Sequence, residues 1–313
     1  MLSQKLIATD ISPALASDSG MNIMSLMDEF KVSHLPVVEK GQLLGLISED
    51  DIWDMHNQEK PINSILLKLK QVFVTFEHDV FEIVKMVNEH DLTLIPIVDN
   101  NRYVGAISVR SILKALASIV AIFSVMILGL ASNWFAAFLL AFTIFFYAVI
   151  YSLILKRKTP QNIVIGGAAG SLPPVIGWVA MAGEISFTPM FLFAIIFFWT
   201  PPHFWSLALI KSEEYKKAKI PMMPIVAGDF STRLQILIYT FVVFAISLIP
   251  VNMGFFGQMY FVSAFCFGIL FLINSFLMCF FPKLFKESWL FLYSIFYLFS
   301  IFLILILDKA FVG

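Results

Sequence analysis

Hydrophobic residues follow two different patterns along the chain. Up to about residue 115, short apolar runs alternate with polar turns and with segments whose apolar residues recur at helical spacing. Short runs bounded by turns are typical of buried strands, and the helical period is typical of amphipathic helices. Beyond residue 115 the apolar runs lengthen to about 20 residues, the length a helix needs to cross a bilayer. The pattern predicts an α/β region followed by an all-α membrane region.

The first region contains an internal repeat with a period of 60 residues. Three pairs of identical residues keep this spacing, namely Pro36 and Pro96, Gly45 and Gly105, and Ser48 and Ser108. Proline, glycine and hydroxyl residues that recur together at a fixed period indicate a duplicated unit. Each copy is predicted to run helix, strand, turn, strand, helix. The strand pairs are LPVV with LLGLIS and LIPIV with YVGAIS.

This region resembles a tandem pair of CBS domains, with repeats at about residues 3–57 and 64–114. In that family, a run of Gly, two apolar residues, Ser or Thr, two further residues and Asp joins a strand to a helix. The hydroxyl caps the helix, and the Asp can hold the ribose of an adenine nucleotide. The first copy has the complete run, which ends in Ser48 and Asp51, whereas Ser111 replaces the aspartate after Ser108.

The resemblance implies that Ser48, Asp51 and Ser108 bind an adenine nucleotide and that the repeats support a homodimer. The residues alone leave a second interpretation open. Serine is a preferred helix N-cap, so Ser48 and Ser108 can be ordinary caps in a pair that binds no ligand. A CBS pair senses or dimerises, and it does not by itself identify the chemistry of the chain.

The composition changes where the apolar pattern changes. Residues 1–115 hold 16 of the 22 acidic residues, whereas residues 116–313 hold 6. The chain has a mean hydropathy of +0.86 and 14% charged residues, against about 25% in soluble domains. We therefore predict a CBS pair at 1–114 and a membrane domain at 115–313. The net charge of −1, without a basic stripe outside the membrane flanks, predicts no nucleic-acid partner.

Seven apolar segments are long enough to span a bilayer: about 115–132, 134–155, 162–182, 188–210, 235–254, 257–279 and 288–307. Lys and Arg occur in alternate linkers, around 156–158, 211–233 and 283–286, and the other linkers have none. Because basic linkers face the cytoplasm, the CBS pair is predicted to lie in the cytoplasm. The N-terminus lacks the long apolar core of a signal peptide, which agrees with a cytoplasmic CBS pair. The prediction is a multi-pass protein of the inner (plasma) membrane, in contact with lipid.

Two proline pairs interrupt the membrane segments. Pro173–Pro174 and Pro201–Pro202 are predicted to break the third and fourth spans. Such breaks are tolerated only where the freed backbone groups face protein or a cavity, so they suggest a polar internal pocket. The aromatic cluster of Phe145, Phe146 and Tyr147 is instead expected to face lipid or the interface.

The cytoplasmic side carries two charged clusters. Lys156, Arg157 and Lys158 follow the second span, and Glu213 and Glu214 follow the fourth. Adjacent carboxylates can bind a hard divalent cation, and metal and cations together stabilise a diphosphate as it leaves. Both clusters also have simpler explanations, since basic residues set topology and the glutamates stand in a charged run that solvent would cover.

His203 is an ionisable residue inside a predicted span. Such residues are functional candidates by default. The alternative is a structural hydrogen bond to a neighbouring helix.

Three runs show which family the membrane region resembles. LKRKTPQNIVIGGAAGSLPPVIGW, WTPPHFWSLAL and EEYKKAKIPMMPIVAG resemble, in order and spacing, the protoheme IX farnesyltransferases, or heme O synthases, of the UbiA prenyltransferase superfamily. The resemblance covers about residues 120–310. It implies a helical bundle around a cavity open to the cytoplasm. It also implies transfer of farnesyl from farnesyl diphosphate to the vinyl group of heme b (protoheme IX), with magnesium (Mg²⁺) as cofactor.

The same resemblance assigns roles to individual residues. Glu213 and Glu214 occupy the second acidic motif, usually aspartates, and would bind magnesium. Lys156 and Arg157 would contact the diphosphate, and these four are the candidate catalytic residues. The candidate substrate-binding residues are Tyr151, Lys158, Asn162, His203, Tyr215 and Lys217. Of these, Asn162 would line the pocket and His203 would contact heme.

The chain departs from that family in its first part. The family has nine spans and a first acidic motif, Asn-x-x-x-Asp-x-x-x-Asp, after the second span, and no such run occurs here. Seven predicted spans remain, and the CBS pair stands where the first two would be. Both motifs are expected to hold magnesium on the diphosphate, so we expect this chain alone to have little or no transferase activity. A joined reading frame, a new arrangement or complementation by a separate N-terminal fragment would each explain the departure.

A function of a different class remains open, a CBS-regulated membrane channel or transporter. It predicts discontinuous helix pairs or internal repeats in the membrane region, and the sequence contains no evident repeat there. We favour the transferase. Binding of heme and farnesyl diphosphate without ion flux would support the transferase, and flux without such binding would support the alternative.

Overall fold

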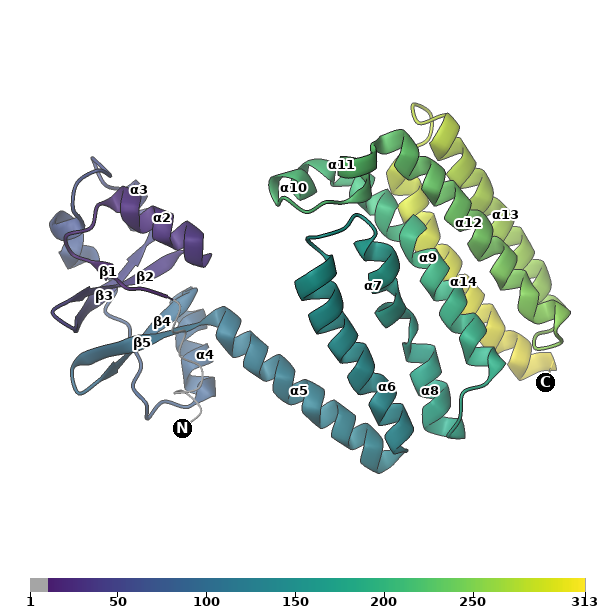
Figure 1. Ribbon diagram of the computed structural model, residues 1–313, viewed down its shortest axis with the longest axis horizontal. Helices are drawn as coiled ribbons and strands as arrows, with labels where there is room; N and C mark the ends of the chain where they lie inside the picture. The colour runs from purple at the N-terminus through teal and green to yellow at the C-terminus, as the bar shows by residue number, and fades with distance from the viewer. Residues whose placement is uncertain (1–10, 313) are drawn as a thin grey trace. The chain divides into compact units, whose positions relative to one another are not determined.

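The computed structural model describes residues 11–312 of the chain. Contacts between Cα atoms divide the chain into two units, Met1–Val120 and Ala121–Gly313 (Figure 1). Helix α5 (Val109–Ala131) contains the point of division, so no loop marks it. The start of the first repeat, predicted at residue 3, lies outside the described residues.

The first unit has the strands that its repeat predicts. Two antiparallel hairpins form it, β2 (His34–Glu39) with β3 (Gln42–Ser48) and β4 (Leu94–Asp99) with β5 (Arg102–Ser108). A short strand, β1 (Ala14–Leu15), pairs in parallel with β2. Both hairpin turns use left-handed backbone, at Lys40 and Gly41 and at Asn100 and Asn101. Two-residue turns of this kind match the twist of the flanking strands.

Helices pack against these strands around one hydrophobic core. They are α2 (Gly20–Phe30), α3 (Glu49–Trp53), the 3₁₀ segment η1 (Ile62–Lys68), α4 (Val80–Glu89) and the first turns of α5. Asp79 and Glu82 form a reciprocal cap at the start of α4, which satisfies two backbone N–H groups that the helix leaves free. The α/β class predicted for this region is confirmed.

Equivalent residues of the two repeats meet at their junction. The Ser33 backbone N–H donates to Thr93 Oγ1 at 3.0 Å, and these residues are 60 positions apart. The parallel pairing of Ala14 with Val37 also has a counterpart 60 residues later, a parallel bridge between Val74 and Ile97. Equivalent residues touch only close to a symmetry axis, so the repeats are related by an approximate two-fold axis at Ser33 and Thr93.

The described chain has seven helical segments long and apolar enough to cross a membrane: Val109–Ala131, Trp134–Leu155, Asn162–Ala182, Phe187–Ile210, Asp229–Asn252, Gln258–Phe280 and Glu287–Phe311. The second segment is α6 (Trp134–Phe145) continued by the π-helical η2 (Phe146–Leu155), and the third is α7 (Asn162–Ser171) with α8 (Pro173–Ala182). The others are α9 (Phe187–Ile210), α12 (Asp229–Asn252), α13 (Gln258–Phe280) and α14 (Glu287–Val312), with short α10 (Ser212–Lys217) and α11 (Met223–Ala227) between α9 and α12. The predicted number and order of spans are confirmed.

The two proline pairs act differently. The third span divides at Leu172, as predicted, because Pro173 has no N–H to continue the hydrogen-bond ladder. The fourth span does not break, since Pro201 and Pro202 lie buried inside the continuous helix α9. Helices α7, α12 and α14 all pack against α9, and such neighbours let a membrane helix tolerate prolines. The predicted break at Pro201–Pro202 is therefore wrong.

Buried polar side chains tie the last three spans together. The Tyr260 hydroxyl donates to the Ser247 carbonyl at 3.0 Å, and the Tyr297 hydroxyl to Ser247 Oγ at 3.2 Å. The Asp308 carboxylate, 2% exposed, accepts from the backbone N–H groups of Gly257 and Tyr260 at the start of α13. Lipid offers no hydrogen bonds, so these contacts fix how α12, α13 and α14 pack.

The basic linkers lie at one end of the helical bundle. The connection into α7, helix α10 and the loop between α13 and α14 are at this end, and the α8–α9 and α12–α13 loops are at the other (Figure 1). The alternation that the charges predict is therefore present in the fold of the second unit.

His34 makes the junction of the CBS repeats sensitive to pH. Its Nδ1 lies 3.2 Å from Ser33 Oγ and 3.4 Å from Thr93 Oγ1. Burial, with a smaller effect of Lys70, lowers the pKa of His34 below 6.5. The folded unit therefore resists a proton that the unfolded chain accepts, and stability that is complete at neutral pH is lost as pH falls through about 6.5.

We expect backbone amides of β2 and β4 to exchange hydrogen faster at pH 5.5 than at pH 7.5, after correction for intrinsic rates. His34→Gln should remove most of this difference in the full chain, and the exposed-site control His56→Gln should leave it unchanged. An equal acid effect in the His34→Gln protein would contradict the assignment.

Candidate active site

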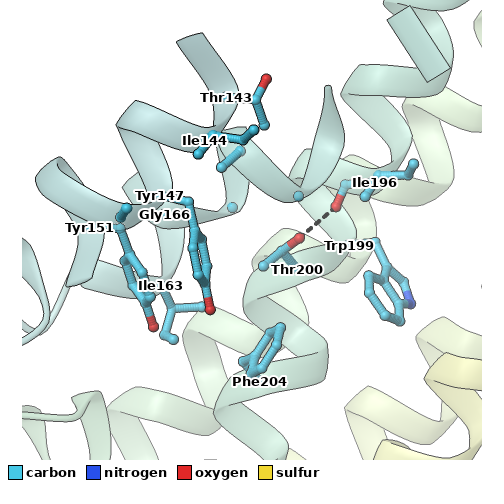
Figure 2. A pocket seen from close by; sticks show the side chains of 14 residues that line it. Thr143, Ile144, Tyr147, Tyr151, Ile163, Gly166, Ile196, Trp199, Thr200 and Phe204 are labelled. Atoms are coloured by element: carbon cyan, nitrogen blue, oxygen red, sulfur yellow. Dashed lines mark hydrogen bonds between the residues drawn. The ribbon is translucent and has the colours of Figure 1, made fainter. Parts of the chain in front are cut away.

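A cavity of about 530 Å³ lies within the second unit (Figure 2). Three helical segments line it. They contribute Thr143, Ile144, Tyr147, Ala148 and Tyr151 from α6 and η2; Ile163, Gly166, Gly167, Ala169 and Gly170 from α7; and Ile196, Trp199, Thr200 and Phe204 from α9. The volume is in the range of small-molecule sites, which are mostly apolar with a few polar groups.

Glycines of α7 allow the neighbouring helices to approach this cavity closely. The ring of Tyr151 occupies the place where a side chain at Gly166 would be, and a Cβ at Gly167 would lie 3.1 Å from Thr200. Tyr151 also packs on Tyr147, with ring centroids 5.3 Å apart and planes 30° apart. Both tyrosines come from the π-helical η2, and π-helical turns occur frequently at functional sites.

The cavity wall is apolar, which corrects the polar pocket suggested by the proline pairs. Thr200 Oγ1 donates to the Ile196 carbonyl at 2.8 Å, the dashed line in Figure 2, and Thr143 Oγ1 donates to the Leu139 carbonyl at 2.7 Å. Each hydroxyl is thus satisfied within its own helix. Tyr147 lines the cavity and is also 55% exposed, so the expectation that it faces lipid or the interface is not contradicted.

The basic loop follows η2, next to one end of the cavity. Lys156, Arg157 and Lys158 are exposed there. The side chain of Asn162 is fully buried, and its Nδ2 donates to the carbonyls of Thr159 at 2.7 Å and Lys156 at 3.4 Å. Its Oδ1 is buried without a partner in the described chain. The sequence predicted that Asn162 lines the pocket. Its neighbour Ile163 lines the cavity instead, and the Asn162 side chain bonds to the basic loop.

The acidic pair lies on α10, at the same end of the bundle as the basic loop (Figure 1). Glu213 and Glu214 are exposed, and Glu214 Oε2 pairs with Lys211 Nζ at 3.0 Å. Tyr215 packs against the core of the bundle and lies within electrostatic range of Tyr151 in the cavity wall. Lys217 is exposed at the end of α10. Within the described chain, no residue of α10 is among those that line the cavity.

The carboxylates of α10 supply few ligands for magnesium. Adjacent helical residues point about 100° apart, and Glu214 is already paired with Lys211. Among the residues that the structure describes, no three His, Cys, Asp or Glu side chains gather into a metal site. Magnesium is often held by one or two carboxylates plus substrate phosphates and water. Glu213, with Glu214 as a second donor, fits that kind of site.

His203 faces a neighbouring helix. Its ring stacks between Trp199 and Phe291, with centroids 4.4 Å and 4.7 Å away. Its Nδ1 lies 2.8 Å from Ser294 Oγ on α14, and Ser294 Oγ donates to the Phe291 carbonyl at 2.6 Å. Because that hydroxyl proton is used, Ser294 Oγ accepts from Nδ1–H. This is the structural hydrogen bond that the sequence left open as the alternative.

The CBS motifs differ between the two repeats. In the first, Ser48 Oγ donates to Asp51 Oδ2 at 2.6 Å, and Asp51 N–H donates back to Ser48 Oγ at 3.1 Å. The Asp51 carboxylate is therefore engaged in capping α3. In the second, the Ser111 N–H donates to Ser108 Oγ at 3.1 Å in the first turn of α5. Both serines are helix caps, as one of the two interpretations requires.

A second cavity, of about 330 Å³, lies beside the second repeat. Ser108, Ser111, Arg110 and Lys114 from β5 and α5 line it, together with Ile11, Glu29, Phe30, Lys31, Val32, Thr93 and Val109. Three of these side chains are cationic. Residues of both repeats thus form the cavity, next to the motif that lacks the aspartate.

Sequence reasoning missed most residues of the cavity in the second unit. Of the predicted site residues, only Tyr151 lines it. One signal is present in the sequence, since Gly166, Gly167 and Gly170 cluster in one span and small residues in membrane helices mark close packing. That signal does not reveal which neighbouring side chains complete the wall.

Comparison with protein families defines the class of this protein. Residues 102–301 match the UbiA prenyltransferase family, which is more than half of the chain. The chain therefore belongs to the UbiA prenyltransferase family. Residues 8–52 and 67–118 match the CBS domain, so a CBS pair is joined to the UbiA domain.

Curated relatives of the chain carry a more specific name. A protoheme IX farnesyltransferase of Nitrobacter hamburgensis is 52% identical over 190 residues, a match that covers 59% of this chain and 61% of the relative. A protein of the same name from Bradyrhizobium diazoefficiens is 51% identical over 195 residues, covering 61% and 62%. The chain thus spans about three-fifths of the length of the curated relatives it matches.

Solved structures similar to part of the chain are CBS proteins. A CBS domain pair/ACT domain protein from Thermotoga maritima is 21% identical and covers 37% of this chain and 96% of its own, with a TM-score of 0.34. CBSX2, solved in complex with AMP, is 19% identical and covers 37% and 95%, with a TM-score of 0.33.

The bonds of Asn162 predict that it holds the basic loop in place. In Asn162→Leu the carbonyls of Thr159 and Lys156 lose their donor, which we expect to speed amide hydrogen exchange in residues 156–161 by about tenfold or more. Gln161→Leu, at an exposed neighbouring position, is the matched control and should leave exchange unchanged. Equal exchange in both variants would show that the loop is held by other contacts.

Proposed function

We propose that the second unit is a heme O synthase-type prenyltransferase domain. It transfers farnesyl from farnesyl diphosphate to the vinyl group of heme b. The observation that carries the proposal is an apolar cavity that extends from the end of the bundle where the basic loop and the acidic α10 segment lie. The names of the curated relatives support this choice of substrates.

The two ends of such a substrate need different surroundings. Lys156 and Arg157 at the exposed end would hold the diphosphate, whose charge belongs in a polar environment. The farnesyl chain would lie among the apolar residues of the cavity, where burial removes it from water. When the allylic C–O bond breaks, its electron pair leaves with the diphosphate. The ring faces of Tyr147, Tyr151 and Trp199 would then stabilise the prenyl cation until a carbon–carbon bond to the vinyl group forms. The π electrons of the vinyl group make that bond, and water would add to the cation left on the heme side chain and release a proton.

Magnesium would bind at Glu213 and Glu214, together with the diphosphate, and when bound it would neutralise charge on the leaving group. Tyr215 and Lys217 are on the same short helix and would orient that end of the substrate, with Lys158 as a further cation. His203 would act from outside the cavity by fixing α9 against α14 through Ser294.

The proposal also covers the location of the protein in the cell and its partners. Basic linkers at one end of the bundle support the cytoplasmic face of an inner membrane for that end, and the CBS pair would lie in the same compartment. Heme, farnesyl diphosphate and membrane lipid are the proposed partners, and a homodimer through the CBS repeats stays a prediction. The alternative, a channel or transporter, predicts a pair of discontinuous helices, and in the described part of the second unit the one divided span is α7–α8.

We further propose that this chain alone is a weak enzyme. About two-fifths of the relatives' length has no counterpart here, and the first acidic motif of the family is not in the sequence. Loss of one of two metal-binding motifs removes charge stabilisation from the leaving diphosphate, which typically costs two or more orders of magnitude in rate.

Heme O formation in cells that lack their own synthase tests the proposal. The chain alone should give little or no heme O, and co-expression with a fragment carrying the first two spans of a relative should restore it. Lys156→Ala with Arg157→Ala should abolish the restored activity, whereas Lys283→Ala with Lys286→Ala, in another loop at the same end, should not. Full activity of the chain alone would refute the proposed impairment. Failure of the purified chain to bind heme and farnesyl diphosphate would refute the function.

We also propose that the first unit binds an adenine nucleotide in the cavity beside α5. The supporting observation is that hydroxyls of Ser108 and Ser111 share this cavity with Lys31, Arg110 and Lys114. Within the described residues, neither Arg110 nor Lys114 forms an ion pair, so both are available to a phosphate. Ser48 and Asp51 remain the candidates in the first repeat.

A change at Arg110 should show which of the two repeats binds the nucleotide. Arg110→Ala is expected to weaken ATP or AMP binding by the full chain about tenfold, because a charge-assisted contact to phosphate is lost. Lys40→Ala, in an exposed hairpin turn away from the cavity, is the control and should bind normally. Loss of binding in Asp51→Ala with normal binding in Arg110→Ala would place the nucleotide in the first repeat instead.

A further inference from the structure

The cavity of the second unit is elongated along the helices that line it. Tyr151 and Phe204 belong to the end near the basic loop, and so does Ile163, the second residue of α7. Thr143 and Ile196 each lie eight residues away from Tyr151 and Phe204 along their helices, and Gly170 lies seven residues beyond Ile163. A helix rises 1.5 Å per residue, so the far end is roughly 10 Å deeper. Thr143, Ile196 and Gly170 therefore surround the deep end.

Gly170 differs from the other glycines of this wall. A Cβ at Gly166 would meet the Tyr151 ring, and a Cβ at Gly167 would lie 3.1 Å from Thr200, so both positions are closed by packing. A Cβ at Gly170 would meet no atom within 4 Å, although Gly170 lines the cavity. Helical glycine costs about 1 kcal/mol relative to alanine. Gly170 is exposed at the cavity wall, and the space beside it has room for a side chain.

We infer that Gly170 sets the length of the isoprenoid chain that the cavity accepts. This inference rests on the proposed function, since it assumes that a prenyl chain enters from the basic end. An isoprene unit adds four carbons to the chain, roughly 5 Å when extended at ordinary C–C bond lengths. Two units end short of Gly170, and the third unit of a farnesyl chain lies beside it. A side chain at this position would take the place of that third unit.

Binding of prenyl diphosphates of different lengths tests the inference without requiring catalysis. The full chain, purified in lipid nanodiscs, is titrated with geranyl diphosphate (two units) and farnesyl diphosphate (three units). Gly170→Leu should weaken farnesyl diphosphate binding about tenfold or more, from the lost burial of the third unit. It should leave geranyl diphosphate binding unchanged, and Gly170→Ala should fall between Gly170→Leu and the unsubstituted chain.

The control is Gly177→Leu on α8. A Cβ at Gly177 also meets no atom within 4 Å, but Gly177 is not part of the cavity wall. The substitution therefore raises helix propensity as Gly170→Leu does, but it does not fill the cavity. Its affinities should equal those of the unsubstituted chain. Ile196→Ala, which enlarges the deep end, should strengthen binding of the four-unit geranylgeranyl diphosphate, and it provides a second test if Gly170→Leu does not fold.

The outcomes separate this inference from the proposed function. If the unsubstituted chain binds neither diphosphate, the proposed function fails and the length inference fails with it. If the unsubstituted chain binds both and Gly170→Leu weakens both equally, or weakens neither, the proposed function stands and the role of Gly170 is refuted. Selective loss of the longer chain supports both.

Discussion

The second unit depends on one constraint, that backbone hydrogen bonds inside a bilayer must be satisfied within the protein. Helices meet it except where prolines remove a backbone N–H. Pro173 ends the ladder of α7 at Leu172, and Pro201, Pro202 and Pro250 lie inside the continuous helices α9 and α12. The hydroxyls of Thr143 and Thr200 in the cavity wall donate hydrogen bonds to carbonyls of their own helices. The two threonine hydroxyls thus add no unpaired donor to the wall, and a mostly apolar chamber lies beside a broken span.

Close helix packing then shapes that chamber. The backbone of α7 at Gly166 lies directly against the Tyr151 ring, and Gly167 brings α7 against Thr200 of α9. Without side chains at these positions, three helices approach closely around the cavity. The basic loop at 156–158 and the acidic pair of α10 are exposed at one end, where the solvent supports their charges. The result is an apolar chamber with a polar entrance, which matches a ligand with an anionic head and a hydrocarbon tail.

The first unit owes its form to duplication. Equivalent residues Ser33 and Thr93 hydrogen-bond across the junction, so each repeat completes the packing of the other. Divergence between the copies then changes local chemistry. The Asp51 carboxylate accepts a hydrogen bond from Ser48 in the cap of α3. Ser111, at the equivalent position, lines a cavity together with Arg110 and Lys114. Helix α5 serves twice, since it starts beside that cavity and its later residues form the first span.

Local patterns predicted most of the elements because their causes are local. Strand pairs follow from short apolar runs around turns, and spans follow from apolar length alone. The break at Pro173 is also local, since it requires only a missing N–H. The prediction of a break failed at Pro201–Pro202, where α9 stays continuous because other helices of the bundle pack around it. Tyr147 is exposed as expected, but its place in a π-helical segment against Tyr151 does not follow from its neighbours in sequence.

The sequence by itself determined the duplicated α/β region, the seven spans and their alternation, and the charged residues at one end. These depend on hydrophobicity, turn residues and charge, which each segment carries without its neighbours. Only the tertiary structure decided which residues enclose the cavity, that its wall is apolar, that Asn162 holds the basic loop and that His203 bonds to α14. Those features arise from contacts between segments far apart in the chain, and their geometry is set by packing rather than by local composition.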